Sequence, residues 1–573
     1  MATNLFKQEI AEALANTELF TKEQVLGLMT IPQDPQHGNF SVPCFSLAKT
    51  LRKAPKIIAE DLSKQISLPS SVSKCEAING YLNYYIDPQI LLQKILSAVA
   101  EQGEKFGHLP SQNKTVIIDY SSPNIGKELA FHHIRSTMIG HALSCIYQAA
   151  GYKVIRINHL GDWGTQFGKL IVMYLRAELP TDVESLAKLT VKELNLLYTQ
   201  FSKAAQKKPE MEDEAREVFA KLEAGDEFYR SLWEAFKEAT LKELRRIYKQ
   251  LGVDFDYYTG ESFFEDLIPP VIDELKAKNL LEVSQEREVV MLEDLDLPPC
   301  LIRKSDGSTL YATRDLAAAI YRQKEYAFDR CLYVVDQGQA LHFKQVFAVL
   351  NKMGYAWSKN MVHIPFGLIL HQNEDGKWEK GKTRTGSASL LRDVIAAAQE
   401  KILEQIQEKN PDLPDAEHVA MQIGVSALTF NDLKNRRLMD VKFDWDSALS
   451  FEGATGPYLQ NAHVRLCSIQ RRAGYQVELS QVDWFHLTDD YSMELVRIID
   501  RKSTRISQAV EHDEPALLAQ YALEIAEAAH RFVHHNRVLG SAEEKSRLFL
   551  VQCTQIVLKD VLTMLGVYPI EAM

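Results

Sequence analysis

The sequence contains no paired cysteine motif. Its seven cysteines are scattered, without a Cys-x-x-Cys pair and without a spacing to histidine that suits a metal site. Such a pattern is typical of reduced, mostly buried thiols, and it argues against a disulfide framework or a zinc site as the basis of the fold. We therefore expect a cytoplasmic protein that holds no metal ion with its own side chains.

Long hydrophobic runs are also missing. No stretch approaches the roughly 20 apolar residues that span a bilayer. The N-terminal segment "MATNLFKQEIAEALANTELF" follows an amphipathic helix pattern that includes acidic residues, so we do not read it as a signal peptide. We expect no association with a membrane, and we find no internal repeat and no low-complexity tail.

The sequence also lacks an excess of positive charge. The net charge is −12, which argues against a nonspecific nucleic-acid binder but is compatible with specific RNA binding through a local basic face. Hydrophobic residues make up 46% and charged residues 25%, as in ordinary globular proteins. Because 573 residues are too many for one core, we expect several domains. Composition alone leaves the function open.

The pattern along the chain divides it into three parts. Residues 1–108 mix helical periodicity with alternating, aromatic-rich stretches such as "CEAINGYLNYYID", which indicates a small α+β domain followed by a linker. Residues 109–400 contain "KTVIIDYSS", a helix and "YKVIRIN", a strand–helix–strand order typical of a parallel sheet. A charged helical insertion is predicted at about 180–290, and residues 401–573 read as an α-helical bundle. The predicted fold class is therefore a Rossmann-type α/β parallel-sheet domain with a helical insertion, an N-terminal α+β domain and a C-terminal α-helical bundle.

The segment "DYSSPNIGKELAFHHIRSTMIGHAL", residues 119–143, carries the most chemistry. It reads as a strand, a loop and a helix, and ligands of open α/β sheets bind at the carboxyl ends of the strands. A helix N-terminus at that point offers free N–H groups to phosphate. Lys127, His132, His133 and Arg135 add cationic donors. Taken alone, the cluster is equally compatible with a solvated helix start.

The same segment resembles the signature region of arginyl-tRNA synthetases, which are class I aminoacyl-tRNA synthetases. The segments "NHLGDWGTQFG", "YATRDLA", "VVDQGQALHFKQV", "KTRTGSA" and "LSFEGATGPYLQNAHVRL" resemble the same family and follow its order, and "DPQHGNFSVPCFSLAK" resembles its N-terminal extension. The resemblance implies a catalytic parallel-sheet domain that uses ATP with Mg²⁺ to activate L-arginine and then charges tRNA(Arg). It also implies that activation requires bound tRNA.

The signature departs from the family pattern His-x-Gly-His. The flanking "SSPN" and "IRST" keep the family's spacing, so Ala130 stands at the first histidine, His132 at the glycine and His133 at the second histidine. In the family these histidines help to stabilise charge on the ATP phosphates. Losing one such donor commonly reduces a rate by about 10²–10³, so we expect a weakened site unless His132 reaches the phosphates from its neighbouring position.

A second ATP signature, Lys-Met-Ser-Lys in other class I enzymes, corresponds here to "EKGKTRTGSA". Lys382, Thr383 and Arg384 match the family's degenerate form, in which the last lysine is absent and is replaced functionally by a lysine upstream, Lys127 here. The alternative is a basic surface hairpin. The resemblance implies the catalytic residues Lys127, His132, His133, Lys382 and Arg384. It implies ATP contacts from Ser122, Pro123, Asn124, His133, His342, Lys382 and Thr383.

An arginine pocket needs planar carboxylate partners, because a guanidinium donates its hydrogen bonds in a fixed fork. Tyr311 and Asp315 lie four residues apart, hence on one helix face. In isolation, Asp315 would equally suit a pair with Arg314 or Lys324. By resemblance, the arginine-binding positions are Asp119, Ser121, Asn124, Tyr311, Asp315 and Gln339. Asp119 and Asn124 are expected at the amino group of arginine, and Tyr311 and Asp315 at its guanidinium.

Contacts with tRNA are predicted at both ends of the chain. The C-terminal helical region carries basic residues beside aromatics, a combination that suits phosphate contact and base stacking, and the family reads the anticodon with this bundle. Asn461 stands where the family usually has an aromatic residue, and the end "IEAM" lacks the arginine that is usual there. Of the functions that the resemblance implies, anticodon binding therefore has the weakest support from the motifs. The candidate contacts are Phe40, Asn79, Tyr81, Tyr458, Arg465 and Arg537.

Three functions remain to be compared. The leading hypothesis is a monomeric cytoplasmic arginine–tRNA ligase. The second is an inactive or weak paralogue that binds arginine or tRNA, which the departures at Ala130 and His132 motivate. The third is a synthetase for another amino acid, which "YATRD" and "VVDQGQ" argue against.

Overall fold

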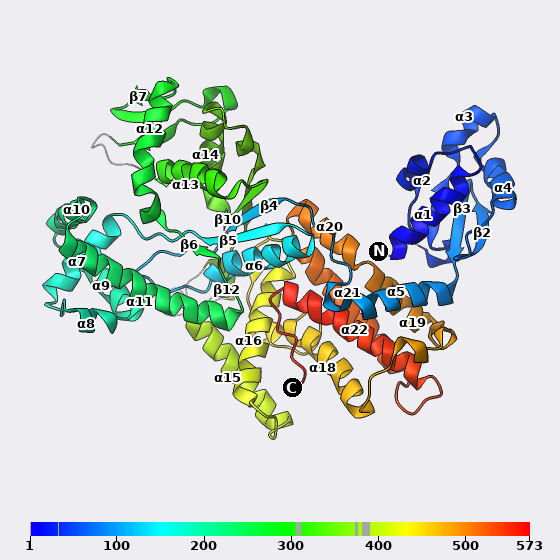
Figure 1. The fold of residues 1–573 in the computed structure, drawn as a ribbon. Coiled ribbons are helices and arrows are strands. Elements are labelled where there is room, and N and C mark those ends of the chain that lie inside the picture. The colour runs from blue at the N-terminus through cyan, green and yellow to red at the C-terminus, as the bar shows by residue number, and fades with distance from the viewer. Residues whose placement is uncertain (1, 33, 305–310, 373–375, 381–389) are drawn as a thin grey trace.

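The computed structural model describes residues 2–32, 34–304, 311–372, 376–380 and 390–573. It consists of a parallel-sheet domain, a helical bundle and a small N-terminal domain that stands apart from both (Figure 1). This agrees with the fold class predicted from the sequence. Among the described residues, no helix combines the length and the apolar character needed to cross a membrane.

The N-terminal domain is built on an antiparallel sheet of order β1-β3-β2. Its strands are β1 (Phe40–Pro43), β2 (Val72–Ile78) and β3 (Tyr81–Ile86), and its helices are α1 (Ala2–Ala15), α2 (Lys22–Leu28), α3 (Ala48–Leu51) and α4 (Pro55–Gln65). Apolar side chains of α1, spaced at helical intervals, are fully buried together with Leu82 and Tyr84 of β3. The domain therefore has a core of its own.

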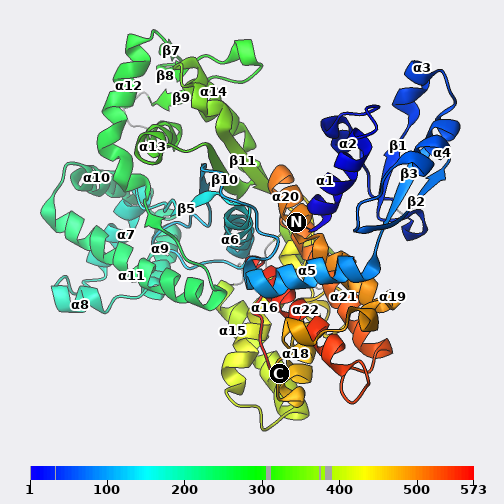
Figure 2. The same cartoon turned by 45° about the vertical axis from the view of Figure 1, so that its right-hand side comes forward.

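Helix α5 (Pro88–Gln102) links this domain to the rest of the chain and packs on C-terminal helices rather than on the N-terminal sheet (Figure 2). The segment after it is fixed there too, since His108 Nε2 lies 2.9 Å from Asp560 Oδ2. Lys502 Nζ lies 2.6 Å from the same carboxylate oxygen. The predicted linker near residue 108 is thus docked on the bundle.

The central sheet has the order β11-β10-β4-β5-β6, and all its strand pairs are parallel. The strands are β4 (Thr115–Asp119), β5 (Lys153–Asn158), β6 (Tyr257–Tyr258), β10 (Arg330–Asp336) and β11 (Met361–Phe366). Val116, Ile117 and Ile118 are fully buried, as expected for a parallel strand covered on both faces. Helices α6 (His133–Ala149), α13 (Tyr311–Tyr326) and α14 (Ala340–Lys352) supply side chains to the edge where these strands end.

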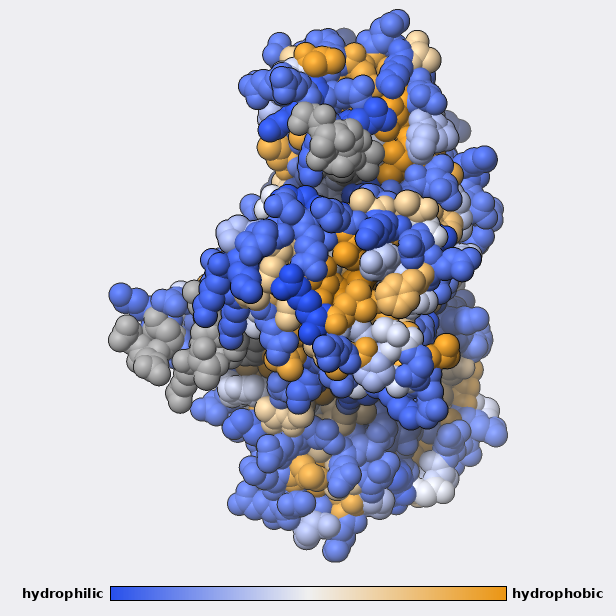
Figure 3. All heavy atoms as spheres, turned by 90° about the vertical axis from the view of Figure 1, so that its left-hand side faces the viewer, coloured by the Kyte–Doolittle hydropathy of each residue, from blue (hydrophilic) through white to orange (hydrophobic). Residues whose placement is uncertain are grey.

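The helical insertion follows β5. It contains α7 (Thr165–Arg176), α8 (Val183–Ala187), α9 (Val191–Ala205), α10 (Glu210–Glu223) and α11 (Glu227–Leu251). The chain returns to the sheet at β6, where Tyr257 pairs with Ile157, and continues through α12 (Ile268–Ala277) into a small antiparallel sheet of β7 (Glu282–Ser284), β8 (Arg287–Val290) and β9 (Cys300–Arg303). Seen from the side of the insertion, the surface is mostly hydrophilic, with apolar side chains near the middle of the view (Figure 3).

The C-terminal part is helical, as predicted. A short sheet of β12 (Ile369–Gln372), β13 (Trp378–Lys380) and β14 (Val441–Lys442) precedes and joins it. Its helices are α15 (Leu391–Lys409), α16 (Ala416–Leu433), α17 (Trp445–Ala448), α18 (Gly456–Ala473), α19 (Asp490–Asp500), α20 (Lys502–His512), α21 (Ala516–His535) and α22 (Glu544–Met564). A Cβ at Gly456 would lie 2.5 Å from the carbonyl oxygen of Ser426, so the close approach of α18 to α16 requires glycine there.

Candidate active site

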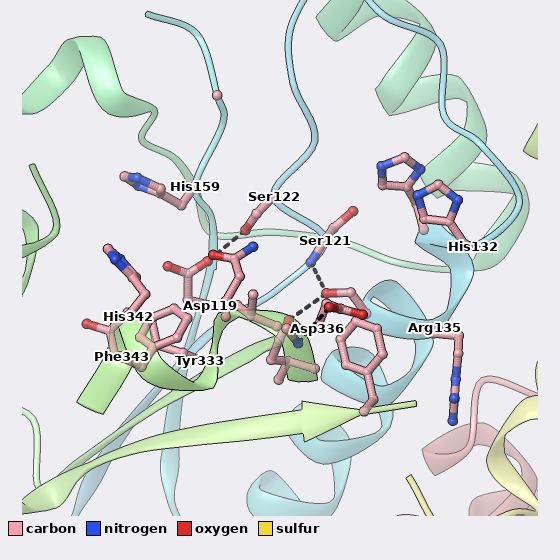
Figure 4. Close-up of a pocket in the computed structure, with 18 of the residues that line it drawn as sticks. Asp119, Ser121, Ser122, His132, Arg135, His159, Tyr333, Asp336, His342 and Phe343 are labelled. Carbon is pink, nitrogen blue, oxygen red and sulfur yellow. Dashed lines mark hydrogen bonds between the residues drawn. The ribbon is translucent and has the colours of Figure 1, made fainter. Parts of the chain in front are cut away.

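A cavity of about 990 Å³ opens at the carboxyl ends of β4 and β10. In Figure 4, His132 lies on one side of it and His159 and His342 on the opposite side, with Asp119 between them. Ten of the residues predicted from the sequence line this cavity, namely Asp119, Ser121, Ser122, Asn124, His132, His133, Tyr311, Asp315, Gln339 and His342.

The loop after β4 forms the floor of the cavity and is held in an unusual backbone conformation. Ser121 and Ser122 have φ angles of 70° and 46°, which non-glycine residues adopt rarely. Hydrogen bonds fix both residues: Ser121 N–H donates to Ser136 Oγ at 2.9 Å, and Ser122 Oγ donates to Asp119 Oδ1 at 3.0 Å. A side chain at Gly161 would collide with Asn124, so the position of Asn124 in this loop requires glycine at residue 161.

The two adjacent histidines lie at the start of α6. Their rings stack with centroids 4.3 Å apart. His133 Nδ1 lies 3.0 Å from both the backbone nitrogen and the carbonyl oxygen of Ala130, and the tautomer of the ring decides whether it accepts or donates. Burial, reinforced by the neighbouring His132, lowers the pKa of His133 to about 4. His133 is therefore a neutral imidazole at pH 7, whereas His132 is exposed to solvent.

A second cavity of about 610 Å³ adjoins this histidine pair. Its lining includes Pro123 and Lys127 from the signature loop and Asn195 from the insertion helix α9. Lys127 Nζ lies 4.4 Å from the centre of the Tyr198 ring on the same helix. The predicted residues Lys382, Thr383 and Arg384 lie outside the described part of the chain. Leu390, which follows them, forms a bridge with Ala130 and lines this cavity.

The opposite end of the main cavity is acidic. Asp315 Oδ2 lies 2.5 Å from His342 Nε2, and Arg314 pairs instead with Glu265 at 2.6 Å. Glu261 is 9% exposed. Burial, with the repulsion of Asp315, raises its pKa to about 8 against the opposing effect of Arg314. Its Oε2 is buried and has no hydrogen-bond partner among the described residues.

Sequence reasoning did not single out Glu261 and His159, which line this cavity, or Arg322, which pairs with the lining residue Asp119. Arg322 is 1% exposed, and its Nη2 lies 2.7 Å from Asp119 Oδ2. Its position was detectable, because it follows Tyr311 by eleven residues and Asp315 by seven and so shares their helix face. Glu261 and His159 line the cavity but follow no periodic pattern that would have singled them out.

Asp119, expected at the amino group of arginine, has both carboxylate oxygens engaged by protein groups. Oδ1 accepts from Ser122 and Oδ2 pairs with Arg322. It still lines the cavity. A direct contact with the substrate would therefore add to existing contacts at this carboxylate.

The predicted tRNA contacts lie at the two ends of the chain. Asn79, with φ of 52°, forms the turn between β2 and β3, and Tyr81 is 36% exposed and packs edge-to-face on Phe45. Phe40 is 3% exposed and pairs with Tyr84 in the sheet. Its side chain belongs to the core of the domain, so the structure does not support the contact with tRNA predicted for it.

In the bundle, Tyr458 and Arg465 of α18 both adjoin His530 of α21. Arg537, just after α21, is exposed. The candidate contacts at this end thus come from two neighbouring helices and the segment that follows one of them.

Three family models together match nearly all of the chain. The model for "tRNA synthetases class I (R), catalytic domain" matches residues 94–445, that for the "Arginyl tRNA synthetase N terminal domain" matches residues 4–86, and that for the "DALR anticodon binding domain" matches residues 459–573. The chain belongs to the arginyl-tRNA synthetase family.

Similar proteins agree with this assignment. The arginine–tRNA ligase of Alkaliphilus metalliredigens is 42% identical over 572 residues, which cover 99% of this chain and 100% of the relative. Arginine–tRNA ligase 1 of Bacillus thuringiensis is 43% identical with the same coverage. The arginyl-tRNA synthetase structure from Thermus thermophilus has the same fold, with a TM-score of 0.78 over 100% of both chains at 24% identity. The recognition made from motifs in the sequence is thus confirmed.

Proposed function

We propose that this protein is an arginine–tRNA ligase. It joins L-arginine and ATP into arginyl-adenylate with release of pyrophosphate, then transfers arginine to the 3′ end of tRNA(Arg). The observation that carries the proposal is the polarity of the main cavity, with carboxylates of Asp315 and Glu261 among its lining and with His132 and His133 at the side that adjoins Lys127. The cationic side chain of arginine suits the end with Asp315 and Glu261, and the anionic triphosphate of ATP suits the end with His132 and His133.

The acidic end binds the guanidinium. Asp315 presents a carboxylate, and Glu261 presents a carboxyl group that ionises when it pairs with the cation. Tyr311, at the first turn of α13, is 66% exposed and adds an aromatic hydroxyl beside the opening. Because a buried carboxylate left without its cationic partner is costly, substrates that lack the guanidinium charge are rejected. Asn124, Ser121 and Gln339 bind the amino and carboxylate groups of arginine.

The signature loop binds ATP. In the activation step, a carboxylate oxygen of arginine attacks the α-phosphorus of ATP, and the bond from that phosphorus to pyrophosphate breaks. Lys127 and the two histidines, with the positive dipole end of α6, stabilise the negative charge that develops on the phosphates. Ser122, Pro123 and His342 contact the nucleotide, and Lys382, Thr383 and Arg384 are assigned to the pyrophosphate by resemblance alone. Mg²⁺ enters as the counterion of the ATP phosphates.

Transfer RNA binds along both outer domains. We assign the exposed face near Tyr81 and Asn79 to the outer part of tRNA(Arg), and the surface around Tyr458, Arg465 and Arg537 to the anticodon arm. Activation requires the bound tRNA. The protein acts as a cytoplasmic monomer, which sedimentation of the free protein and of its tRNA complex tests.

The direct test is aminoacylation of tRNA(Arg) with radiolabelled arginine, with lysine and citrulline as competitors. The proposal predicts esterified arginine and no inhibition by a tenfold excess of either analogue. Charging with lysine, or binding of arginine without any charging, would contradict it. The latter result is what an inactive paralogue gives, and the ten predicted residues among the lining of the main cavity do not favour that reading.

A further inference from the structure

Asp162 is a fully buried carboxylate one residue after Gly161, which lines the main cavity. Its Oδ1 accepts from the backbone N–H of Ser262 at 2.9 Å. Its Oδ2 accepts from the hydroxyl of Ser262 at 2.7 Å and pairs with Lys237 Nζ at 2.5 Å. Asp162 is not among the described residues that line either cavity, so it acts on a ligand through its neighbours.

The segment that Asp162 holds is the one that carries Glu261. Ser262 follows Glu261 directly, and the N–H of Glu261 donates to the carbonyl oxygen of Leu160 at 3.0 Å. A side chain at Gly260 would collide with the carboxylate of Asp162, so the segment approaches this carboxylate as closely as glycine allows. Three consecutive residues thus lie against the loop after β5, and this contact sets the position from which Glu261 enters the cavity.

Helix α11 of the insertion anchors the loop that carries Asp162. Trp233 Nε1–H donates to the carbonyl oxygen of Asp162 at 2.8 Å. Lys237 follows Trp233 by four residues, hence on the same helix face, and reaches the carboxylate of Asp162. Because a buried carboxylate without a cationic partner is costly, Lys237 is the residue that compensates for the burial of Asp162.

The charge of Asp162 also acts on Glu261. Besides burial, three carboxylates raise the pKa of Glu261 and one guanidinium lowers it, namely those of Asp315, Asp162 and Glu265 and that of Arg314. Lys237 offsets one of these negative charges. Because Glu261 must release a proton to pair with a guanidinium, the loss of this offset disfavours the binding of arginine.

We propose that Asp162 and Lys237 are positioning residues that together hold Glu261 at the guanidinium-binding end of the main cavity. Asp162 fixes the backbone beside Glu261, and Lys237 compensates the charge of Asp162 and ties it to the helical insertion. The inference rests on the proposed function, in which Glu261 pairs with the guanidinium of arginine. Loss of Lys237 therefore raises Kd and KM for arginine and leaves KM for ATP unchanged.

The test is a double-mutant cycle of Lys237→Met and Glu261→Gln, with arginine binding measured by calorimetry at mildly alkaline pH. Lys237→Met is expected to weaken binding about tenfold in the wild-type background. In a protein that already carries Glu261→Gln, the same substitution should change affinity by no more than about twofold, the scatter of independent sites. Lys237→Arg, which keeps the cation, should retain more affinity than Lys237→Met. A lysine with a purely structural role gives the same loss in both backgrounds.

The matched control is Lys242→Met, since Lys242 is an exposed lysine of α11 that lines neither cavity. It should leave arginine binding unchanged. If Lys237→Met melts below the assay temperature, Ser262→Ala takes its place in the cycle, because it removes a hydrogen bond to Asp162 and changes no charge.

Two results would overturn the role of the pair and leave the proposed function standing. One is a Lys237→Met protein that binds arginine as tightly as the wild type, and the other is an equal loss of affinity with and without Glu261→Gln. Arginine-dependent ATP–pyrophosphate exchange in the presence of tRNA(Arg) separates the two claims, since wild-type protein that shows no exchange would overturn both.

Discussion

The carboxylate of Asp119 lies 2.7 Å from the guanidinium of Arg322, and both side chains are almost fully buried. Arg322 comes from α13, the helix that also carries Tyr311 and Asp315, while Asp119 ends β4. The pair therefore fixes the helix that carries Tyr311 and Asp315 against the sheet edge that carries the signature loop.

Replacing Arg322 by Met should destabilise the fold strongly. Removing one partner of a buried ion pair leaves an uncompensated charge and costs about 3–5 kcal/mol. Urea unfolding measures the change, and Arg322→Lys, which keeps the charge, should lose less. Lys324→Met on the exposed side of the same helix is the control. A loss below about 1 kcal/mol, the range of exposed pairs, would show that the Asp119–Arg322 pair does not hold this edge together.

Asp315→Asn should weaken arginine binding. Truncating one partner of a desolvated charge pair costs about 2–5 kcal/mol, which corresponds to at least about 30-fold in Kd. Calorimetry with arginine measures it. Asp273→Asn, at an exposed aspartate of α12, provides the matched control. If both variants bound arginine equally well, the guanidinium would have to lie elsewhere in the cavity.

Arginine affinity should depend on pH through Glu261. Its pKa of about 8 in the free protein lies above the ordinary 4.5, so it is protonated at neutral pH and must release a proton to pair with a guanidinium. Affinity should rise with pH up to about 8, by at most tenfold per pH unit since about one proton is released. Glu261→Gln should remove this slope in calorimetry between acidic and mildly alkaline pH. An identical slope in the variant would assign the titration to another group.

The same group affects stability with the opposite sign. Because the folded protein binds the proton of Glu261 more tightly than the unfolded chain, its contribution to stability is present at low pH and is lost as pH rises from 4.5 to about 8. The wild type should therefore lose more stability across this window than Glu261→Gln does, by urea unfolding at several pH values.

The contact between Lys127 and Tyr198 ties the signature loop to the helical insertion. Cation–π contacts at partly exposed sites contribute about 0.5–1 kcal/mol, so Tyr198→Leu should raise KM for ATP by about two- to fivefold, the same range expressed as a ratio. Tyr198→Phe keeps the ring face and should behave like the wild type. Tyr229→Leu removes another lysine–tyrosine contact, with Lys221, away from both cavities. Parallel effects of the leucine variants would point to a general change in the insertion.

The sequence predicted the parts of this site that belong to continuous motifs. Asp119 ends one strand, Asn124 and His133 follow it, and Gln339 follows another strand. Parallel strands bring their carboxyl ends to a common edge, so the convergence of these residues follows from sheet topology. Arg322 and Glu261 could not be assigned in the same way. The role of Arg322 depends on its pairing with Asp119, and that of Glu261 on its burial near Arg314 and Asp315. Both are decided by packing between elements far apart in the chain.

The docking of α5 illustrates the same limit. Its apolar periodicity predicts a helix with one buried face, but periodicity does not tell which domain covers that face. In the structure the contact comes from C-terminal helices, as where Cys553 Sγ of α22 lies 3.7 Å from the carbonyl oxygen of Leu96, 457 positions earlier in the chain.

The central claim is that this chain activates arginine with ATP, and arginine-dependent ATP–pyrophosphate exchange with and without tRNA(Arg) tests it most directly. The account predicts exchange that depends on arginine and appears only when tRNA(Arg) is present, with "AFHH" acting as a functional form of the signature. Absence of exchange in both conditions, from a folded protein that still binds arginine, would contradict it.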